Sequence, residues 1–164
     1  MKLDHVNIVV SDMDRSVAFY TRLGLTKSLD TIISGAWIAN LMGIQDDNLR
    51  ARVTFMEPGD GTARLEMIQY LTLPGDSASI NSHSNTIGVR HFALVVDDII
   101  CTYHDLLADG VSFFSEPQEV TGNKEVAARI GRKWMVYLLD PDGVIVELAQ
   151  YSSPEDVVSS KEMT

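Results

Sequence analysis

The sequence contains a single cysteine, few basic residues and no long apolar run, and each scarcity narrows what the protein can be. Cys101 has no partner within the chain, so an internal disulfide is excluded and a reducing compartment is expected. No apolar stretch reaches the roughly 18–20 residues of a transmembrane helix, and the first residues lack the pattern of a signal peptide. The 13 Lys and Arg residues against 23 Asp and Glu give a net charge of −10, which argues against nucleic acid and anionic membranes as partners. We therefore expect a soluble, cytoplasmic protein.

The length and composition fit an ordinary folded protein. The chain has 164 residues, of which 45% are hydrophobic and 22% are charged. A chain of this length buries about two-thirds of its unfolded surface and needs no covalent staple to fold. The composition excludes collagen, a coiled coil and a wholly disordered chain, and the length allows one domain or two small halves that share a core.

The chain contains an internal repeat with a period of about 86 residues. Residues 4–13 read DHVNIVVSDM and residues 90–99 read RHFALVVDDI, and a glycine lies 19 residues after the histidine of each segment. Each half then closes on a strand-like segment that carries one glutamate, Glu66 or Glu147. Because this period is too long for a solenoid, the two copies indicate a duplicated module.

Each copy predicts a β-α-β-β-β unit. Apolar residues typical of a strand open each half, over residues 3–10 and 89–96. Asp12 and Asp98 stand where a helix N-cap is expected, and the glycine of each half can end that helix in a left-handed conformation. Three further strands complete each half, so the expected fold class is α+β.

We expect the modules to span residues 1–75 and 86–151 within one structural domain, followed by a polar tail over residues 152–164. Loops this long in a compact domain are usually functional or mobile. Three long segments are expected to be loops, namely residues 34–49, 71–88 and 121–133.

Lone polar residues stand among apolar neighbours on one face of four predicted strands. Because side chains alternate along a strand, His5, Glu66, His91 and Glu147 lie opposite fully apolar faces. A carboxylate in a buried strand is costly unless something pairs with it. Two carboxylates and two imidazoles, placed symmetrically by the repeat, could converge on one Ni, Zn, Co, Mn or Fe ion. Four unrelated residues, each with its own hydrogen bond, are the alternative.

Other side chains carry weaker signals. The histidines outside the set are expected to be solvated. Cys101 lies one turn inside the second predicted helix and is expected to be a packing residue. Several cations could bind an anionic substrate or simply lie at the surface. The apolar residues of the 34–49 segment suit a lid, a pocket wall or a dimer contact. These candidates are His83 and His104; Arg50, Arg52, Arg64, Arg132 and Lys133; and Trp37, Ile38, Leu41 and Met42. The sequence has no Gly-rich phosphate loop, no Cys-pair zinc motif and no nucleophile elbow.

With those residues in view, the chain resembles the vicinal oxygen chelate superfamily, which includes glyoxalase I, methylmalonyl-CoA epimerase, extradiol dioxygenases and bleomycin-resistance proteins. The resemblance covers most of residues 3–151. It is carried by residues 5–12 with 16–25, by residues 88–99, and by residues 137–148 around the DPDG turn.

The resemblance implies two paired β-α-β-β-β modules that form a curved mixed sheet around a central metal cleft. By position, His5, Glu66, His91 and Glu147 would be the ligands of one divalent metal ion, and Glu66 or Glu147 would be the catalytic base. A His-Glu-His-Glu set looks like glyoxalase I, and epimerases have a similar set. Dioxygenases of this type look like two His and one carboxylate, and bleomycin-binding relatives usually lack the set.

The resemblance therefore implies a lyase or isomerase that transfers a proton next to a carbonyl held by the metal. The alternatives are an Fe(II) extradiol-type dioxygenase and a non-catalytic protein that binds a small molecule. Bacterial glyoxalase I has an asparagine four residues after the first glutamate, to hold glutathione, and Tyr70 stands there in this chain. The resemblance therefore leaves the identity of the substrate open. A small-molecule substrate and a homodimer are the expected partners.

Overall fold

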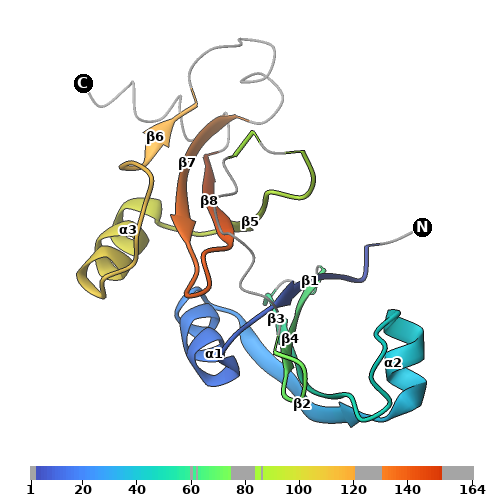
Figure 1. The fold of residues 1–164 in the computed structure, drawn as a ribbon. Coiled ribbons are helices and arrows are strands. Elements are labelled where there is room, and N and C mark those ends of the chain that lie inside the picture. Colours follow the sequence, from blue (N-terminus) through green and yellow to red (C-terminus); the bar gives the residue numbers. More distant parts are fainter. Residues whose placement is uncertain are drawn as a thin grey trace, which may run out of the picture. The chain divides into compact units, whose positions relative to one another are not determined.

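The computed structural model describes residues 3–59, 61, 63–74, 84–85, 87–120 and 131–152. The chain divides into two compact units, Met1–Ile80 and Asn81–Thr164. Each unit contains a four-stranded mixed sheet and repeats the order β-α-β-β-β, with one additional helix in the first unit (Figure 1). The expected α+β class and its two modules are therefore confirmed. The tail from residue 153 onward lies outside the described residues.

The first unit pairs its strands in the order β1-β4-β3-β2. β1 runs parallel to β4, and the other pairs are antiparallel. The elements are β1 (His5–Val9), α1 (Met13–Arg22), β2 (Thr26–Ser34), α2 (Ala36–Met42), β3 (Arg50–Glu57) and β4 (Arg64–Tyr70).

The second unit repeats this topology in the order β5-β8-β7-β6, with β5 parallel to β8. The first of the three further strands expected in this half, over residues 112–120, is much shorter than predicted. Residues 112–120 contribute the two-residue β6 and an isolated bridge between Phe113 and Leu138. The elements are β5 (His91–Val95), α3 (Ile99–Ala108), β6 (Gln118–Glu119), β7 (Arg132–Leu139) and β8 (Ile145–Ser152).

The two matching helices begin and end as the sequence predicts. The Asp12 carboxylate accepts a hydrogen bond from the Arg15 amide at 3.1 Å, and the Asp98 carboxylate accepts one from the Cys101 amide at 2.9 Å. Both glycines that follow the helices have the left-handed φ that favours glycine. None of the helices in the described part of the chain is long and apolar enough to cross a membrane.

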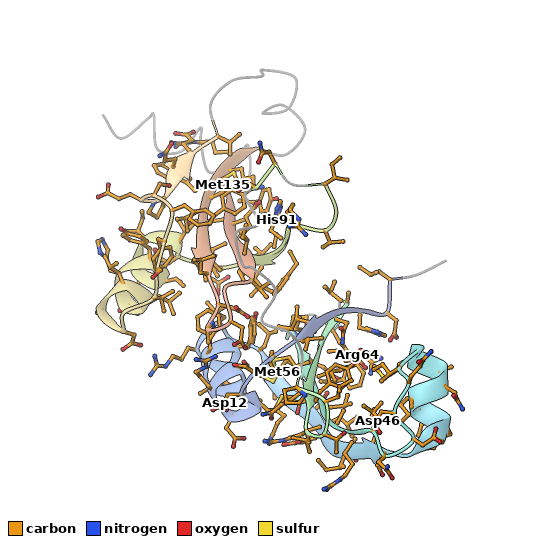
Figure 2. The ribbon with its side chains drawn as sticks, viewed as in Figure 1. Asp12, Asp46, Met56, Arg64, His91 and Met135 are labelled. Carbon is orange, nitrogen blue, oxygen red and sulfur yellow. The ribbon has the colours of Figure 1, made fainter. Side chains whose placement is uncertain are left out.

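In each unit the helix after the first strand covers the apolar face of the sheet. In the first unit, Met13 and Tyr20 of α1 are fully buried, as are Met56 and Met67 of the sheet. Figure 2 shows Met56 on the α1 side of this sheet and Arg64 on the other side. The opposite faces of the strands are therefore left for the polar residues of the repeat.

The 34–49 segment contains a helix where a loop was expected, so that prediction was wrong. Residues 36–42 form α2, which ends at Gly43 with a left-handed φ of 69°. Ile38 is buried against Leu49, while Trp37 and Leu41 are 63% and 76% exposed. The helix is only seven residues long, so its apolar residues do not repeat often enough to reveal a helical period in the sequence.

An ion cluster ties α1 to β2 and β3 of the first sheet. The Arg52 guanidinium donates to Asp30 at 2.7 and 2.8 Å and to Asp14 of α1 at 2.8 Å. Lys27 and Thr54 also donate to Asp30, at 3.1 and 3.3 Å. The hydrogen bonds from Arg52 hold the pKa of Asp30 well below its ordinary value. Arg52 therefore stabilises the fold through these two carboxylates, which favours ordinary placement over a grip for an anionic substrate.

Replacing Asp30 with asparagine is expected to lower the free energy of unfolding at pH 7 by about 1–2 kcal/mol, because charged hydrogen bonds are lost. Since the folded-state pKa of Asp30 is lowered, its contribution is present above about pH 4 and declines as the pH falls. Urea titrations of wild type and Asp30→Asn at pH 7 and pH 2 measure this difference. The exposed Asp47→Asn variant is the control, and an equal loss at both pH values would contradict the prediction.

Candidate functional site

Strand register places the first histidine and the first glutamate on one face of their sheet. In the parallel pair of β1 and β4, His5 lies opposite Arg64 and Asn7 lies opposite Glu66. Because side chains alternate along each strand, all four point away from the face that α1 covers. His5 and Glu66 therefore lie on the same face of the first sheet, as the alternation in the sequence predicted.

His5 and Glu66 form the first His–Glu pair, with His5 Nε2 3.4 Å from Glu66 Oε2. Asn7 donates its amide N–H to the same Glu66 oxygen at 2.9 Å. The other ring nitrogen of His5, Nδ1, lies 2.8 Å from Asp4, which also receives a bond from Arg64 at 2.6 Å. These hydrogen bonds from His5 and Arg64 lower the pKa of Asp4. A carboxylate on Nδ1 is a common outer partner of a metal-binding histidine, because it orients the ring and directs Nε2 to the metal.

The first pair borders an aromatic and apolar surface. The Phe55 ring meets the His5 ring edge-on at 5.9 Å, and the Arg64 guanidinium lies 4.4 Å above the Phe55 ring. Further along the same face, Tyr70 packs against Met42 of α2. Burial and, to a lesser degree, the negative charge of Glu66 raise the pKa of Tyr70. This face can therefore contact the apolar part of a ligand.

His91 and Glu147 form the second His–Glu pair, with His91 Nε2 3.4 Å from Glu147 Oε2. The distance and the atoms are the same as in the first pair. Figure 2 shows His91 on the side of the second sheet that faces away from α3. Here Lys133 donates to the other oxygen, Glu147 Oε1, at 2.6 Å, and Tyr137 forms a further hydrogen bond with the carboxylate. Glu147 is only 4% exposed, so these partners compensate a buried charge.

The groups around Glu147 perturb one another. Burial disfavours the Lys133 ammonium, but the hydrogen bond and charge of Glu147 outweigh it, so the pKa of Lys133 is raised. Burial, together with the hydrogen bond to Glu147 and its charge, raises the pKa of the Tyr137 hydroxyl. Lys133 therefore stays an ammonium ion and Tyr137 stays a neutral hydrogen-bond donor at neutral pH.

The two pairs share their histidine and glutamate but differ in what surrounds them. In the strand registers, Tyr137 lies opposite Glu147 where Phe55 lies opposite Glu66. Lys133 lies opposite the tyrosine four residues after its glutamate, and in the first unit Ala51 takes that place. The repeat has therefore kept the His–Glu pair twice, and among the described residues a lysine bonds directly to the second carboxylate, whereas Arg64 beside the first pair bonds to Asp4.

The donor chemistry of each pair fits a divalent metal ion. Two ligands at about 2.1 Å from a metal lie about 3.0 Å apart in octahedral geometry and about 3.4 Å apart in tetrahedral geometry. The Nε2–Oε2 separation of 3.4 Å in both pairs meets this requirement. Within the residues that the structure describes, no group of three or more His, Cys, Asp or Glu side chains could hold a metal. Each pair therefore offers two donor atoms that a metal ion could use.

The remaining histidines and the cysteine lie apart from both pairs. His104 is exposed on α3, as expected, and contacts the Tyr103 ring. Cys101 is exposed as well, so its expected packing role was wrong. The charge of nearby Asp105, whose carboxylate lies 3.7 Å from the sulfur, raises the pKa of the thiol. His83 lies outside the described residues.

Three other cations of the sequence prediction have separate positions. Arg132 makes a two-bond ion pair with Glu119 at 2.7 and 2.8 Å, Arg64 pairs with Asp4 beside the first His–Glu pair, and Arg50 is exposed. Among the cations that could bind an anionic substrate, Lys133 bonds to Glu147 and Arg64 bonds to Asp4, the partner of His5.

Sequence reasoning missed the partners that hold the two carboxylates, Asn7, Tyr137 and the pairing of Lys133. In the second unit, the sequence around the DPDG turn could have identified two of these partners. Tyr137 and Glu147 lie at equal distances along the chain from Asp142 in the DPDG turn, and an antiparallel hairpin about that turn pairs them directly. The same count places Lys133 four residues earlier on the same face of β7.

Comparison with known proteins agrees with this architecture. Residues 2–148 match the model of the Glyoxalase/Bleomycin resistance protein/Dioxygenase superfamily. A glyoxalase family protein from Bacillus cereus has a similar fold, with a TM-score of 0.79, 22% identity, and coverage of 93% of this chain and 95% of that one. The trypanothione-dependent glyoxalase I of Leishmania major aligns with a TM-score of 0.58 and 19% identity, over 99% of this chain and 94% of that one.

Two curated proteins are similar at the level of sequence. The glyoxalase domain-containing protein RDO1 of Mycosarcoma maydis is 26% identical over 155 residues, which are 91% of this chain and 68% of that protein. A 2-epi-5-epi-valiolone epimerase of an Actinomyces species is 27% identical over 148 residues, which are 88% of this chain and 76% of that protein.

Two β-α-β-β-β units, each with a histidine on its first strand and a glutamate on its last, define a duplicated α+β fold. The chain belongs to the Glyoxalase/Bleomycin resistance protein/Dioxygenase superfamily.

Proposed function

We propose that the protein is a divalent-metal-dependent lyase or isomerase that transfers a proton next to a carbonyl group. His5, Glu66, His91 and Glu147 would be the ligands of one metal ion. The observation that carries the proposal is the duplicated pair, with His Nε2 and Glu Oε2 at the same separation of 3.4 Å in both units. A shared role as metal ligands would account for the same geometry in both units.

Imidazole and carboxylate donors suit Ni, Zn, Co, Mn and Fe(II), and such an ion, when bound, supplies Lewis-acid polarisation of a carbonyl. The chain's own residues would hold the metal and move the proton. Glu66 takes a neutral amide bond from Asn7, whereas Glu147 is bound by the Lys133 ammonium. Glu66 is therefore the better candidate to accept the proton, and Glu147 the better candidate to stay in place.

The similar proteins support this class of reaction. One is named as an epimerase and another as a glyoxalase I, so an isomerase or lyase is favoured over a binding protein. The aromatic surface of Phe55 and Tyr70 beside the first pair provides contact for an apolar part of the substrate.

Metal content is the direct test. Elemental mass spectrometry on protein purified anaerobically, without a metal-affinity column, is expected to find about one Ni, Zn, Co or Mn ion per chain. His5→Ala and Glu147→Ala are expected to lose it, and His104→Ala is the matched control. Iron at the same ligands would favour the Fe(II) extradiol-type dioxygenase. Absence of metal after reloading would favour a protein that only binds a small molecule.

Proton transfer has its own readout. Candidate thioesters and hemithioacetals are incubated with the metal-loaded protein in deuterium oxide, and mass spectrometry measures deuterium at the carbon next to the carbonyl. Exchange that depends on Glu66 would support the proposed reaction. A protein that binds such ligands without exchange would contradict it.

A further inference from the structure

Lys133 is the feature that most clearly separates the two His–Glu pairs. Its Nζ lies 2.6 Å from Glu147 Oε1 and 5.6 Å from the centre of the Tyr151 ring, and its side chain is 17% exposed. The equivalent place in the first unit is held by Ala51, which is fully buried. A lysine at this register position is thus specific to the second unit.

We infer that Lys133 is an internal counter-ion of Glu147 that competes electrostatically with the divalent ion and thereby sets the affinity of the site for metal. This inference rests on the proposed function, because it takes Glu147 as a metal ligand. Lys133 acts through Glu147 and is a positioning residue.

The geometry lets both cations use one carboxylate. Lys133 bonds to Oε1, while Oε2 faces His91 Nε2 at 3.4 Å. An ammonium ion on one oxygen and a divalent ion on the other are only a few ångströms apart, and they repel strongly in a partly buried site. Without metal, the same ammonium compensates a carboxylate whose side chain is 6% exposed.

Removing the charge should therefore have opposite effects on the two forms of the protein. The metal-free protein loses the partner of a buried carboxylate, so its melting temperature should fall by several degrees. The metal-binding form loses a repelling charge, so its affinity should rise. A lysine that only oriented Glu147 would have the reverse effect on affinity, because loss of an outer partner typically weakens metal binding about 10–100-fold.

Two variants of full-length protein separate charge from hydrogen bonding. Lys133→Met removes both, and Lys133→Gln keeps an N–H donor without the charge. Lys27→Gln is the matched control, because Lys27 pairs with Asp30 at 3.1 Å on the α1 side of the first unit. Each protein is stripped of metal and titrated at pH 7 with Co²⁺, and the visible absorption of the ion reports both affinity and coordination.

Lys133→Met and Lys133→Gln are each expected to bind Co²⁺ about tenfold more tightly than wild type, and Lys27→Gln is expected to match wild type. Unchanged or weaker binding in both Lys133 variants would overturn the inference while leaving the proposed metal site intact. If wild type binds no Co²⁺ and a Lys133 variant does, the inference is supported. If wild type and both Lys133 variants bind none, the proposed function fails and the inference fails with it.

Discussion

Replacing Glu147 with leucine is expected to lower the free energy of unfolding of the metal-free protein by about 3 kcal/mol. Glu147 is 4% exposed and forms a charged hydrogen bond of 2.6 Å with Lys133. Leucine fills a similar volume but leaves the Lys133 ammonium without its counter-charge in a site that reaches little water. Breaking a buried pair by removing one partner costs about 3–5 kcal/mol, and the partial exposure of Lys133 places the estimate at the lower end.

Glu66→Leu is the matched control, because Glu66 occupies the equivalent position in the first unit. Its partners His5 and Asn7 reach water, so the loss there should stay below about 1 kcal/mol. Chemical unfolding in the presence of EDTA measures both variants without a contribution from metal. Equal losses in the free energy of unfolding would mean that the ion pair with Lys133 gives Glu147 no larger contribution to stability than Glu66 has.

The fold was predictable because local signals recur in both halves of the sequence. Asp12 and Asp98 each cap a helix, and alternation along the strands correctly separated the apolar face from the face with His5 and Glu66. The helix α2 was missed because seven residues give too little periodicity, and because its burial depends on contacts with Leu49 and Tyr70 that lie elsewhere in the chain.

The candidate site was predictable only in part. The repeat identified His5, Glu66, His91 and Glu147, and the structure brings them together two by two. The set of four as ligands of one metal stays a prediction. The count about the DPDG turn places Lys133 on the face of Tyr137 and Glu147, and the register of β7 with β8 agrees with it. The ion pair itself did not follow from the sequence, because an ammonium near a strand end can pair with many carboxylates.

Replacing either histidine with alanine is expected to weaken divalent-metal binding about a hundredfold. Four-ligand zinc sites bind with about 10–16 kcal/mol, so one ligand of four contributes about 3 kcal/mol, or roughly a factor of 100. Because His5 and His91 stand 3.4 Å from their glutamates through the same atoms, their losses should be alike. Competition with a chromogenic chelator measures both affinities.

His104→Ala provides the control, because His104 is exposed on α3 and touches only the neighbouring tyrosine ring among the contacts of the described residues. Its metal affinity should equal that of wild type. A hundredfold loss in His5→Ala with none in His91→Ala, or the reverse, would assign the metal to one His–Glu pair alone. The duplicated geometry would then reflect the common origin of the two modules, and the other pair would serve only to compensate its own buried carboxylate. Equal losses, together with a stoichiometry of one ion per chain, would indicate that both modules contribute to the same metal, because two separate sites would bind two ions.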